Sequence, residues 1–228
     1  MHVKKAREAM KQGRMTKEQF KAIFERFEKR ARATLRRGKR RSLTRYSMYR
    51  RIRECLGEPM SGKILGISGI EGFYSFINRK NAEVIEVQYP HADMQNLPFK
   101  DDTFDFVISD QVIEHIHDPK RAICESFRVL KKGGVAIHTT CFMNYFHPSP
   151  IDFWRFSPDA LRHICNVCGF SEILQCEGWG NRIVNLLCFI SDIFRSMKIP
   201  ETRLSARHLI ATLNEERYPI VTWVVTRK

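Results

Sequence analysis

The feature that most constrains the fold is a regular exchange of strand-like and helix-like segments from residue 62 to the end of the chain. Short apolar runs, KILGI, AEVIEV, FDFVISD and VAIHTT, are typical of strands, and they alternate with helical patterns of about 10–15 residues. Such alternation indicates βαβ units, in which crossover helices join parallel strands. Two further strands are expected at SEILQCEGW and PIVTWVVTRK. The sequence therefore predicts an α/β fold with a mostly parallel sheet.

The intervening segments predict the helices. They are expected at GFYSFINRK after the first strand, at PKRAICESFRVLKKGG after the third and at SPDALRHICNVCGF after the fourth. The longest apolar stretch, residues 183–193, is interrupted by Asn185, Ser191 and Asp192. We interpret it as a buried helix, because a membrane span needs roughly 18 or more apolar residues.

Positive charge is concentrated at the beginning of the chain. Residues 1–55 hold 20 Lys and Arg against 5 Asp and Glu, a net charge of +15, whereas the whole chain carries +14. Apolar residues recur at helical spacing within residues 17–37, and Gly38 is a natural end for that helix. A basic loop then leads into a second short helix. We therefore divide the chain into a basic helical extension, residues 1–55, and a main domain, residues 56–228.

Two interpretations of the extension stay open. Its helices pack as a lid on the main domain with their cations solvated, or the cations contact a polyanion or an anionic membrane surface. Sequence-specific binding of nucleic acid is disfavoured, because no zinc finger or aromatic-rich recognition motif is present.

The seven cysteines indicate in which cellular compartment the protein is expected. Their number is odd and their spacing is irregular, which indicates a reducing environment. The basic start, MHVKKAREAMKQGR, lacks the apolar core of a secretory signal. We therefore expect a cytoplasmic location, with peripheral contact to a membrane as an extension of that prediction.

One stretch carries several short motifs in a fixed order. ADMQNLPFKDDTFDFVISDQVIEHIHDPKRAICESFRVLKKGGVAIHTT contains Leu97-Pro98-Phe99, Phe104-Asp105, Glu114-His115, Arg128-Val129-Leu130 and Gly133-Gly134. It resembles class I S-adenosylmethionine-dependent methyltransferases of the small-molecule type. The resemblance covers about residues 62–180 and implies S-adenosylmethionine as cofactor and a seven-stranded, doubly wound, Rossmann-like sheet. HPSPIDFWRFSPDALRHICNVCGF and GWGNR are similar to the branch found in polysaccharide and glycan biosynthesis.

The glycine loop departs from the pattern that this resemblance implies. In GKILGISGIEG, Gly66 stands where the family has an acidic residue, and Ser68 and Ile70 replace two glycines. Gly69 can supply a positive φ and Gly72 can permit close approach of helix and strand. The resemblance implies cofactor contacts from Ser68, Gly69 and Gly72. Loss of the acid leaves open whether this loop still binds the cofactor.

The other cofactor-binding residues are inferred from their positions at strand ends. An acid ending the second strand holds ribose hydroxyls in this family, and Glu86 is the candidate, with Gln88 if the register shifts by two. The resemblance places Asp93 and Met94 against the adenine. Beyond these, it implies that the cofactor lies over Ser109, Asp110 and Gln111, with Glu114-His115 shaping the site.

Candidate catalytic residues follow the fourth strand. Methyl transfer to a hydroxyl benefits from a base of near-neutral pKa, and His147 is the first candidate, as base or acceptor binder. Asp152 would orient His147 or act as an alternative base, and Arg155 would clamp an anion or a hydroxyl. A structural loop is the competing interpretation of this segment. Further expected contacts are sugar stacking by Phe153 and Trp154 and an acceptor side formed by Trp179, Asn181 and Arg182.

No metal site is expected. Cys165 and Cys168 form a single C-x-x-C without a second pair, and His115 and His117 diverge if they lie on a helix. The predicted function is O-methylation of a sugar hydroxyl on a surface glycan or its precursor. The alternatives are methylation of another small molecule or of RNA, and a non-catalytic scaffold whose degenerate loop has lost the cofactor.

Overall fold

The computed structural model describes residues 16, 18–19, 21–22, 25–26, 29, 42–74, 79–199 and 205–228. The helix expected within residues 17–37, and its end at Gly38, lie largely outside these residues. The second short helix of the extension is α3. In chain order the elements are α3 Leu43–Leu56, β1 Met60–Ile67, α4 Glu71–Tyr74, β2 Arg79–Val87, β3 Phe104–Asp110, η1 Ile113–His115, α5 Pro119–Val129, β4 Leu130–Cys141, α6 Pro158–Val167, β5 Glu172–Trp179, α7 Arg182–Ile190, η2 Asp192–Phe194, α8 Ala206–Thr212 and β6 Val221–Arg227.

The described strands form one mixed sheet of six, in the order β2-β1-β3-β4-β6-β5. The pairs β1·β2, β1·β3 and β3·β4 are parallel, whereas β6 runs antiparallel to β4 and β5. The α/β fold is confirmed, but the expectation of seven mostly parallel strands is wrong for this part of the chain. After β5, the chain passes through α7 and α8 and enters β6 beside the end of β5, where Trp179 pairs with Val221. No crossover returns it to the start of β5, so the pairing is antiparallel.

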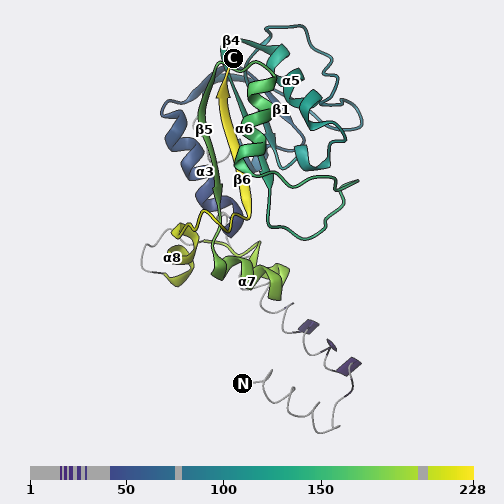
Figure 1. Ribbon diagram of the computed structural model, residues 1–228, viewed down its shortest axis with the longest axis vertical. Helices are drawn as coiled ribbons and strands as arrows, with labels where there is room; N and C mark the ends of the chain where they lie inside the picture. The colour runs from purple at the N-terminus through teal and green to yellow at the C-terminus, as the bar shows by residue number, and fades with distance from the viewer. Residues whose placement is uncertain are drawn as a thin grey trace.

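Helices cover both faces of the sheet, as a doubly wound fold requires. Figure 1 shows α3 on one side of the strands and α5 on the other. Because strand side chains alternate, Ile64 belongs to the core beneath α3, and the next residue, Leu65, belongs to the core beneath α5 and α6. The two cores together fix the strand ends on which the site is built.

α3 is part of this packed body. Its side chains Leu43, Met48, Tyr49 and Ile52 are buried, and the helix lies against β5 and β6. Full burial of an apolar side chain of this size contributes about 1.5–3 kcal/mol. α3 is therefore joined to the main domain by a shared core.

Several element boundaries differ from the sequence prediction. Of the helix expected at residues 72–80, the structure describes α4 up to Tyr74, and residues 75–78 lie outside the described part. Arg79 already belongs to β2, so the expected helix cannot reach residue 80. The helix expected to run to residue 134 ends at Val129. There the buried Leu130 begins β4 by pairing with Phe104, so a long-range strand pairing replaces the last helical turn.

The apolar stretch at residues 183–193 forms α7, but the expectation that this helix is buried is wrong. Val184 and Cys188 are buried, whereas Leu186, Phe189 and Ile190 are exposed, Phe189 by 91%. Only one stripe of the helix reaches the core, which leaves the opposite face apolar and open. Within the described residues, no helix combines the length and apolar content that crossing a membrane requires.

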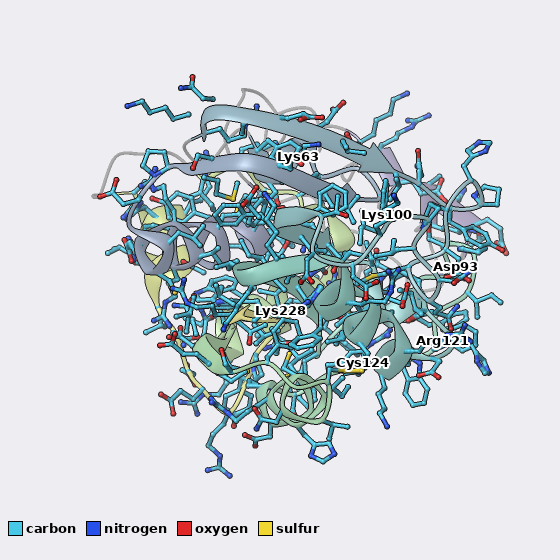
Figure 2. All side chains as sticks on the ribbon, turned by 90° about the horizontal axis from the view of Figure 1, so that it is seen from above. Lys63, Asp93, Lys100, Arg121, Cys124 and Lys228 are labelled. Carbon is cyan, nitrogen blue, oxygen red and sulfur yellow. A yellow bond between two sulfur atoms is a disulfide. The ribbon has the colours of Figure 1, made fainter. Side chains whose placement is uncertain are left out.

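A disulfide contradicts the expectation that the cysteines are reduced. Cys124 of α5, labelled in Figure 2, is bonded to Cys168 at the end of α6, with their Cα atoms 4.9 Å apart. Cys165, the other half of the C-x-x-C, is a buried free thiol. The bonded residues are 44 positions apart in sequence, so only the packing of α6 against α5 brings them together.

Candidate functional site

A cavity of about 570 Å³ opens at the carboxyl ends of β1, β2 and β3. This is the edge of an open parallel sheet at which ligands bind, because the loops there diverge to either face. The cavity is lined by Ile67, Ser68, Gln88, Tyr89, Ala92, Asp93, Met94, Gln95, Gln111, Val112, His115, Ile116, His117, Ser149, Pro150, Ile151 and Phe153.

The chain bends sharply as it leaves β1 and β3. Ser68 and Gln111 are left-handed, with φ of 59° and 60°, a conformation uncommon for residues other than glycine. Each bend is held by a backbone bond to the neighbouring strand: Ser68 N donates to Val87 O at 2.8 Å, and Gln111 N donates to Thr139 O at 3.0 Å. Strained conformations of this kind cluster at ligand sites, and both residues line the cavity.

The glycine loop is closed by apolar packing. A Cβ on Gly66 would lie 2.2 Å from Ile70 Cδ1 and 2.8 Å from Tyr74 Oη, so the position expected to carry an acid has no room for one. Gly69 has the expected positive φ, 77°. A Cβ on Gly72 would meet only Tyr49 Oη, at 3.9 Å, so the close approach expected at Gly72 occurs at Gly66 instead. Gly69 and Gly72 do not line the cavity.

The end of β2 separates the two candidates for the ribose contact. Glu86 does not line the cavity, and its Oε1 accepts a hydrogen bond from Ile70 N at 3.1 Å. Gln88 lines the cavity. Glu86 therefore stabilises the glycine loop, and Gln88 becomes the candidate for the ribose contact.

Asp110 is also turned away from the cavity. Its carboxylate accepts hydrogen bonds from Tyr49 Oη on α3 and from Thr139 Oγ1 on β4. Asp110 does not line the cavity, whereas its neighbour Gln111 does. Of the two residues expected to contact the cofactor, Gln111 lines the cavity and Asp110 joins α3 to the sheet.

Asp93 and Met94 lie on the loop between β2 and β3, and both line the cavity. The Asp93 carboxylate accepts from Gln95 N at 2.8 Å and from Gln95 Nε2 at 3.1 Å, and Met94 is buried. The adenine contact expected of both residues stays a prediction. Figure 2 labels Asp93 at the rim of the molecule, away from the strands.

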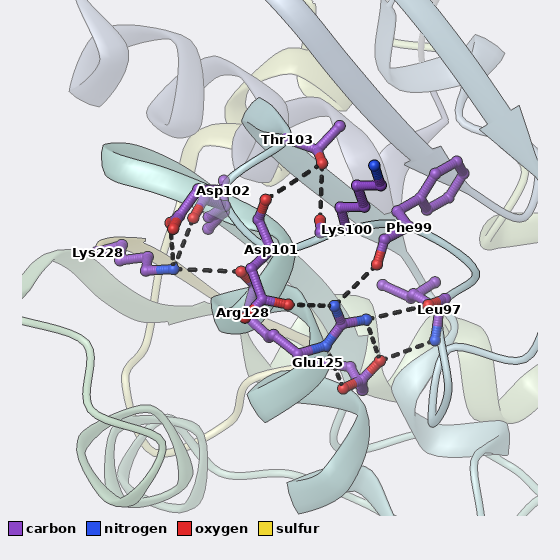
Figure 3. A network of polar contacts seen from close by, with 10 residues as sticks. Leu97, Phe99, Lys100, Asp101, Asp102, Thr103, Glu125, Arg128 and Lys228 are labelled. Atoms are coloured by element: carbon purple, nitrogen blue, oxygen red, sulfur yellow. Dashed lines mark hydrogen bonds and ion pairs between the residues drawn. The ribbon is translucent and has the colours of Figure 1, made fainter.

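The loop after Asp93 is held by Arg128 of α5, as Figure 3 shows. Arg128 donates from Nη2 to Leu97 O at 3.0 Å and from Nη1 to Phe99 O at 2.8 Å. Glu125 Oε2 in turn accepts from Leu97 N at 2.9 Å. The Arg128 guanidinium holds the pKa of Glu125 below its usual range. These contacts give a physical reason for the Leu97-Pro98-Phe99 and Arg128-Val129-Leu130 motifs.

A second cavity, of about 320 Å³, adjoins the first. The two share Gln111, His115 and Ser149 in their linings, so these three residues stand at the border between them. The rest of the second lining comes from α3, from the loop after β4 and from the C-terminal third of the chain: Thr44, Arg45, Cys141, Asn144, Tyr145, His147, Arg195, Ile220 and Val221.

His147 and Asp152 are neighbours, as the sequence predicts. Asp152 Oδ2 accepts from His147 N at 2.8 Å and lies 3.3 Å from His147 Nδ1, and the Asp152 side chain is only 1% exposed. The Arg155 guanidinium, which donates to Oδ2 at 2.7 Å, holds the pKa of Asp152 well below its usual range. A carboxylate of such low pKa is a poor base, so the geometry favours Asp152 as the residue that orients His147.

Arg155 is engaged within its own loop. Besides Asp152, it donates to Trp154 O at 2.7 Å and to Tyr145 O at 2.9 Å. These contacts hold the loop together, and they leave little of the guanidinium for the expected clamp on a substrate. Trp154 is 44% exposed and donates from Nε1 to Ile116 O at 2.9 Å.

Trp179, Asn181 and Arg182, the acceptor contacts expected from GWGNR, line neither cavity. Trp179 and Asn181 are fully buried. Asn181 Oδ1 accepts from Val184 N at 2.9 Å as the N-cap of α7, and Arg182 is paired with Glu215. The motif therefore shapes the turn between β5 and α7.

Glu114, His115 and His147 form a cluster that sequence reasoning missed. One potential ligand atom from each lies within 4.8 Å of the others. Glu114 is fully buried; its Oε2 accepts from Thr140 Oγ1 at 2.9 Å, and its Oε1 has no hydrogen-bond partner. Burial raises the pKa of Glu114. The sequence argument paired His115 with His117, whereas the loop after β4 brings in His147, a contact that no local spacing signals.

Part of the chain is similar to known methyltransferases. Residues 51–138 match the methyltransferase domain. The chain is 40% identical over 102 residues to 2-methyl-6-phytyl-1,4-hydroquinone methyltransferase 1 of Oryza sativa subsp. japonica, which covers 42% of this chain and 30% of the relative. It is 33% identical over 76 residues to demethylmenaquinone methyltransferase of Staphylococcus epidermidis, covering 33% and 32%. The chain thus spans about a third of the length of these relatives.

Solved structures show the same fold. The [4+2]-cyclase SpnF has a TM-score of 0.54 at 17% identity, covering 80% of both chains. Phosphoethanolamine N-methyltransferase 2 of Haemonchus contortus, in complex with S-adenosyl-L-methionine, has a TM-score of 0.54 at 14% identity, covering 80% of this chain and 52% of that one. A cyclase among the neighbours shows that this fold does not determine the reaction.

The residues that line the larger cavity fit S-adenosylmethionine in part. S-adenosylmethionine is the cofactor supported by the domain match, as the sequence predicts. The larger cavity offers an acceptor for the adenine amino group on Asp93, an apolar surface on Met94 and polar groups on Ser68, Gln88 and Gln111. The departure from the family pattern is the missing acid at Gly66, whose space is taken by Ile70.

Proposed function

We propose that the protein transfers a methyl group from S-adenosylmethionine to a hydroxyl group of an acceptor. The single observation that carries this proposal is the pair of adjoining cavities, which share Gln111, His115 and Ser149. A transferase needs two binding spaces with a common border, because the group must pass directly from donor to acceptor.

The chain's own residues would act mainly by positioning. When bound, S-adenosylmethionine supplies a methyl group on a positively charged sulfur. Asp93, Met94 and Gln88 would hold the adenosine half, and the bends at Ser68 and Gln111 would bring backbone close to it. His147 lies in the acceptor cavity with Asp152 fixing its ring, where it would bind the acceptor hydroxyl or take its proton.

The charge of the second cavity favours an acceptor with an anionic group. Arg45 and Arg195 both line it, and the Arg195 guanidinium stacks 4.5 Å from the Tyr145 ring centroid. A phosphorylated sugar precursor of a glycan, linked to a nucleotide or a lipid, has the hydroxyls, the negative charge and the ring that these residues suit. Phe153, exposed by 41%, lines the neighbouring cavity and offers a stacking surface.

A second candidate acceptor is a hydroquinone. It is favoured by the names of two relatives from Oryza sativa subsp. japonica, 40% and 45% identical over 102 and 89 residues. Arg45 and Arg195 would suit a phenolate as well as a phosphate. A non-catalytic scaffold is the remaining alternative, and the packed glycine loop around Gly66 is the feature that favours it.

Calorimetric titration with S-adenosylmethionine and with S-adenosylhomocysteine tests the proposal first. We expect saturable binding that Asp93→Asn weakens. Transfer of a labelled methyl group to a panel of nucleotide-linked sugars, lipid-linked sugars and hydroquinones then identifies the acceptor. Absence of binding at millimolar cofactor would overturn the enzymatic proposal in favour of a scaffold, and label found only on a hydroquinone would replace the glycan acceptor.

Contact with an anionic membrane stays a prediction, and α7 adds an observation in its favour. Leu186, Phe189 and Ile190 expose a continuous apolar face on one short helix, and residues 1–55 carry a net charge of +15. An apolar face combined with basic segments is the usual composition of a peripheral membrane contact. A lipid-linked acceptor would be presented at such a surface.

A further inference from the structure

We propose that Glu114, His115 and His147 bind a divalent first-row transition metal ion at the border between the two cavities. The cluster combines a buried carboxylate from η1, the adjacent imidazole and a second imidazole from the loop after β4. His115 lines both cavities and His147 lines the second, so an ion held by them would face the acceptor space.

The donor set has the chemistry of a catalytic metal site. Two imidazoles and one carboxylate are a common set of three protein ligands for Zn²⁺, with the fourth position left to water or substrate. The same set suits Fe²⁺, Co²⁺ and Mn²⁺, because nitrogen and oxygen ligands are shared among these ions. Mg²⁺ is a poorer match, since it prefers oxygen ligands alone.

The surrounding contacts orient the two imidazoles. His115 Nδ1 donates to Ile151 O at 2.7 Å, and because a carbonyl only accepts, the lone pair of this ring lies on Nε2. His147 Nδ1 lies 3.0 Å from Tyr145 O and 3.3 Å from Asp152 Oδ2, which leaves its Nε2 as the ligand atom. Metal-binding histidines almost always carry such an acceptor on the second nitrogen.

Glu114 supplies the independent observation. Its carboxylate is fully buried, yet Oε1 has no hydrogen-bond partner. An unpaired buried carboxylate oxygen is costly, and coordination of a cation is one of the few ways to offset that cost. The competing explanation is the positive charge of Arg45, which acts on Glu114 without an added ion. The two explanations differ in whether the protein binds a metal.

The role of the ion rests on the proposed function. An acceptor hydroxyl bound at the open position would lose its proton to solvent at neutral pH, because a divalent cation lowers the pKa of a coordinated oxygen. The new O–CH₃ bond would form as the methyl–sulfur bond breaks, with the electron pair passing to sulfur and S-adenosylhomocysteine leaving. In this arrangement His147 is a ligand rather than the general base.

Titration of the chelator-treated full chain with Zn²⁺, Mn²⁺ and Mg²⁺ tests the site directly. We expect one equivalent of Zn²⁺ to bind, with Mg²⁺ much weaker. Glu114→Gln and His147→Asn should each lower the Zn²⁺ affinity by more than about 100-fold, because loss of an outer contact alone costs about 10–100-fold. The matched control is His117→Asn, which removes a neighbouring cavity imidazole outside the cluster and should change the affinity by less than about twofold.

Circular dichroism of each variant shows whether it is folded. If Glu114→Gln does not fold, His147→Asn still tests the site, because His147 is only half-buried and its replacement disturbs the core less. Zn²⁺ affinity unchanged in folded Glu114→Gln and His147→Asn would overturn the proposal, since the ion would then bind elsewhere. Absence of binding in the native chain would do the same and favour compensation by Arg45. Metal binding without cofactor binding would retain the ion site and reject the methyl-transfer function.

Discussion

Arg128 and Glu125 meet in a side-on pair, with Nε donating to Oε1 and Nη2 donating to Oε2, both at 2.8 Å. The pair lies on α5, but its remaining bonds go to the loop that follows Asp93, at Leu97, Phe99 and Asp101. A helix on one face of the sheet thereby sets the position of a loop at the cavity. We therefore expect the pair to link the stability of the fold to cofactor binding.

Arg128→Lys is expected to lower the free energy of unfolding by about 2 kcal/mol, because a lysine cannot replace the bonds to two carboxylates and two carbonyls. S-adenosylhomocysteine affinity should fall with it. Urea unfolding and calorimetry measure the two effects. Arg121→Lys, on the exposed first turn of the same helix, should leave both unchanged, and an equal loss there would show that the network has no special role.

Gly66→Ala should destabilise the protein by roughly 1–3 kcal/mol, because the added methyl overlaps the buried Ile70 side chain. Gly72→Ala, in the first turn of α4, should be neutral or stabilising, since its methyl meets only Tyr49 Oη at 3.9 Å. Thermal unfolding compares the two. Equal stability of both variants would contradict the tight packing of the loop.

Gln88→Glu should raise the affinity for S-adenosylhomocysteine about fivefold, because a carboxylate forms stronger hydrogen bonds to ribose hydroxyls than an amide does. Glu86→Gln retains an acceptor for Ile70 N and should leave the affinity within about twofold. Calorimetry on both variants decides between the candidates. A large loss in Glu86→Gln with no change in Gln88→Glu would assign the ribose contact to Glu86.

The buried His138 is expected to make the stability of the protein sensitive to acid. It is fully buried on β4, with Nδ1 2.8 Å from Ser109 Oγ, and burial lowers its pKa to about 4. The unfolded chain has a histidine pKa of about 6.5, so between about pH 6.5 and 4 the unfolded state binds the additional proton. The contribution of His138 to the free energy of unfolding is thus fully present above pH 6.5, and about 3 kcal/mol of it is lost as the pH falls to 4. His138→Asn should remove this slope in urea unfolding, and an unchanged slope would assign it to other groups.

Phe189→Ser should weaken binding to vesicles of anionic lipid about tenfold, since loss of one large apolar contact costs about 1.5 kcal/mol or more. Val167→Ser on α6 is the control, because Val167 is an exposed apolar residue on a different helix. Co-sedimentation with vesicles measures both. Equal binding by the two variants, or no binding by the native chain, would reject α7 as a membrane contact.

The sequence predicts what local patterns encode. Strand and helix alternation predicts the α/β fold, and the family resemblance singles out Asp93, which lines the cavity. The predictions that failed depend on contacts between distant segments. Leu130 begins a strand because Phe104 is its partner, and Gly66 is glycine because Ile70 fills the space above it. His147 joins Glu114 only after β4 and its loop have folded beside η1.

α3 contributes to the protein in two ways at once, since its apolar face completes the core and its first turn supplies Thr44 and Arg45 to the acceptor cavity. The donor cavity is lined by none of its residues. Under the proposed function, α3 therefore contributes to the choice of acceptor, although it precedes the strands that line the larger cavity. We expect exchange of that helix between related chains to change the acceptor and to leave binding of S-adenosylmethionine unchanged.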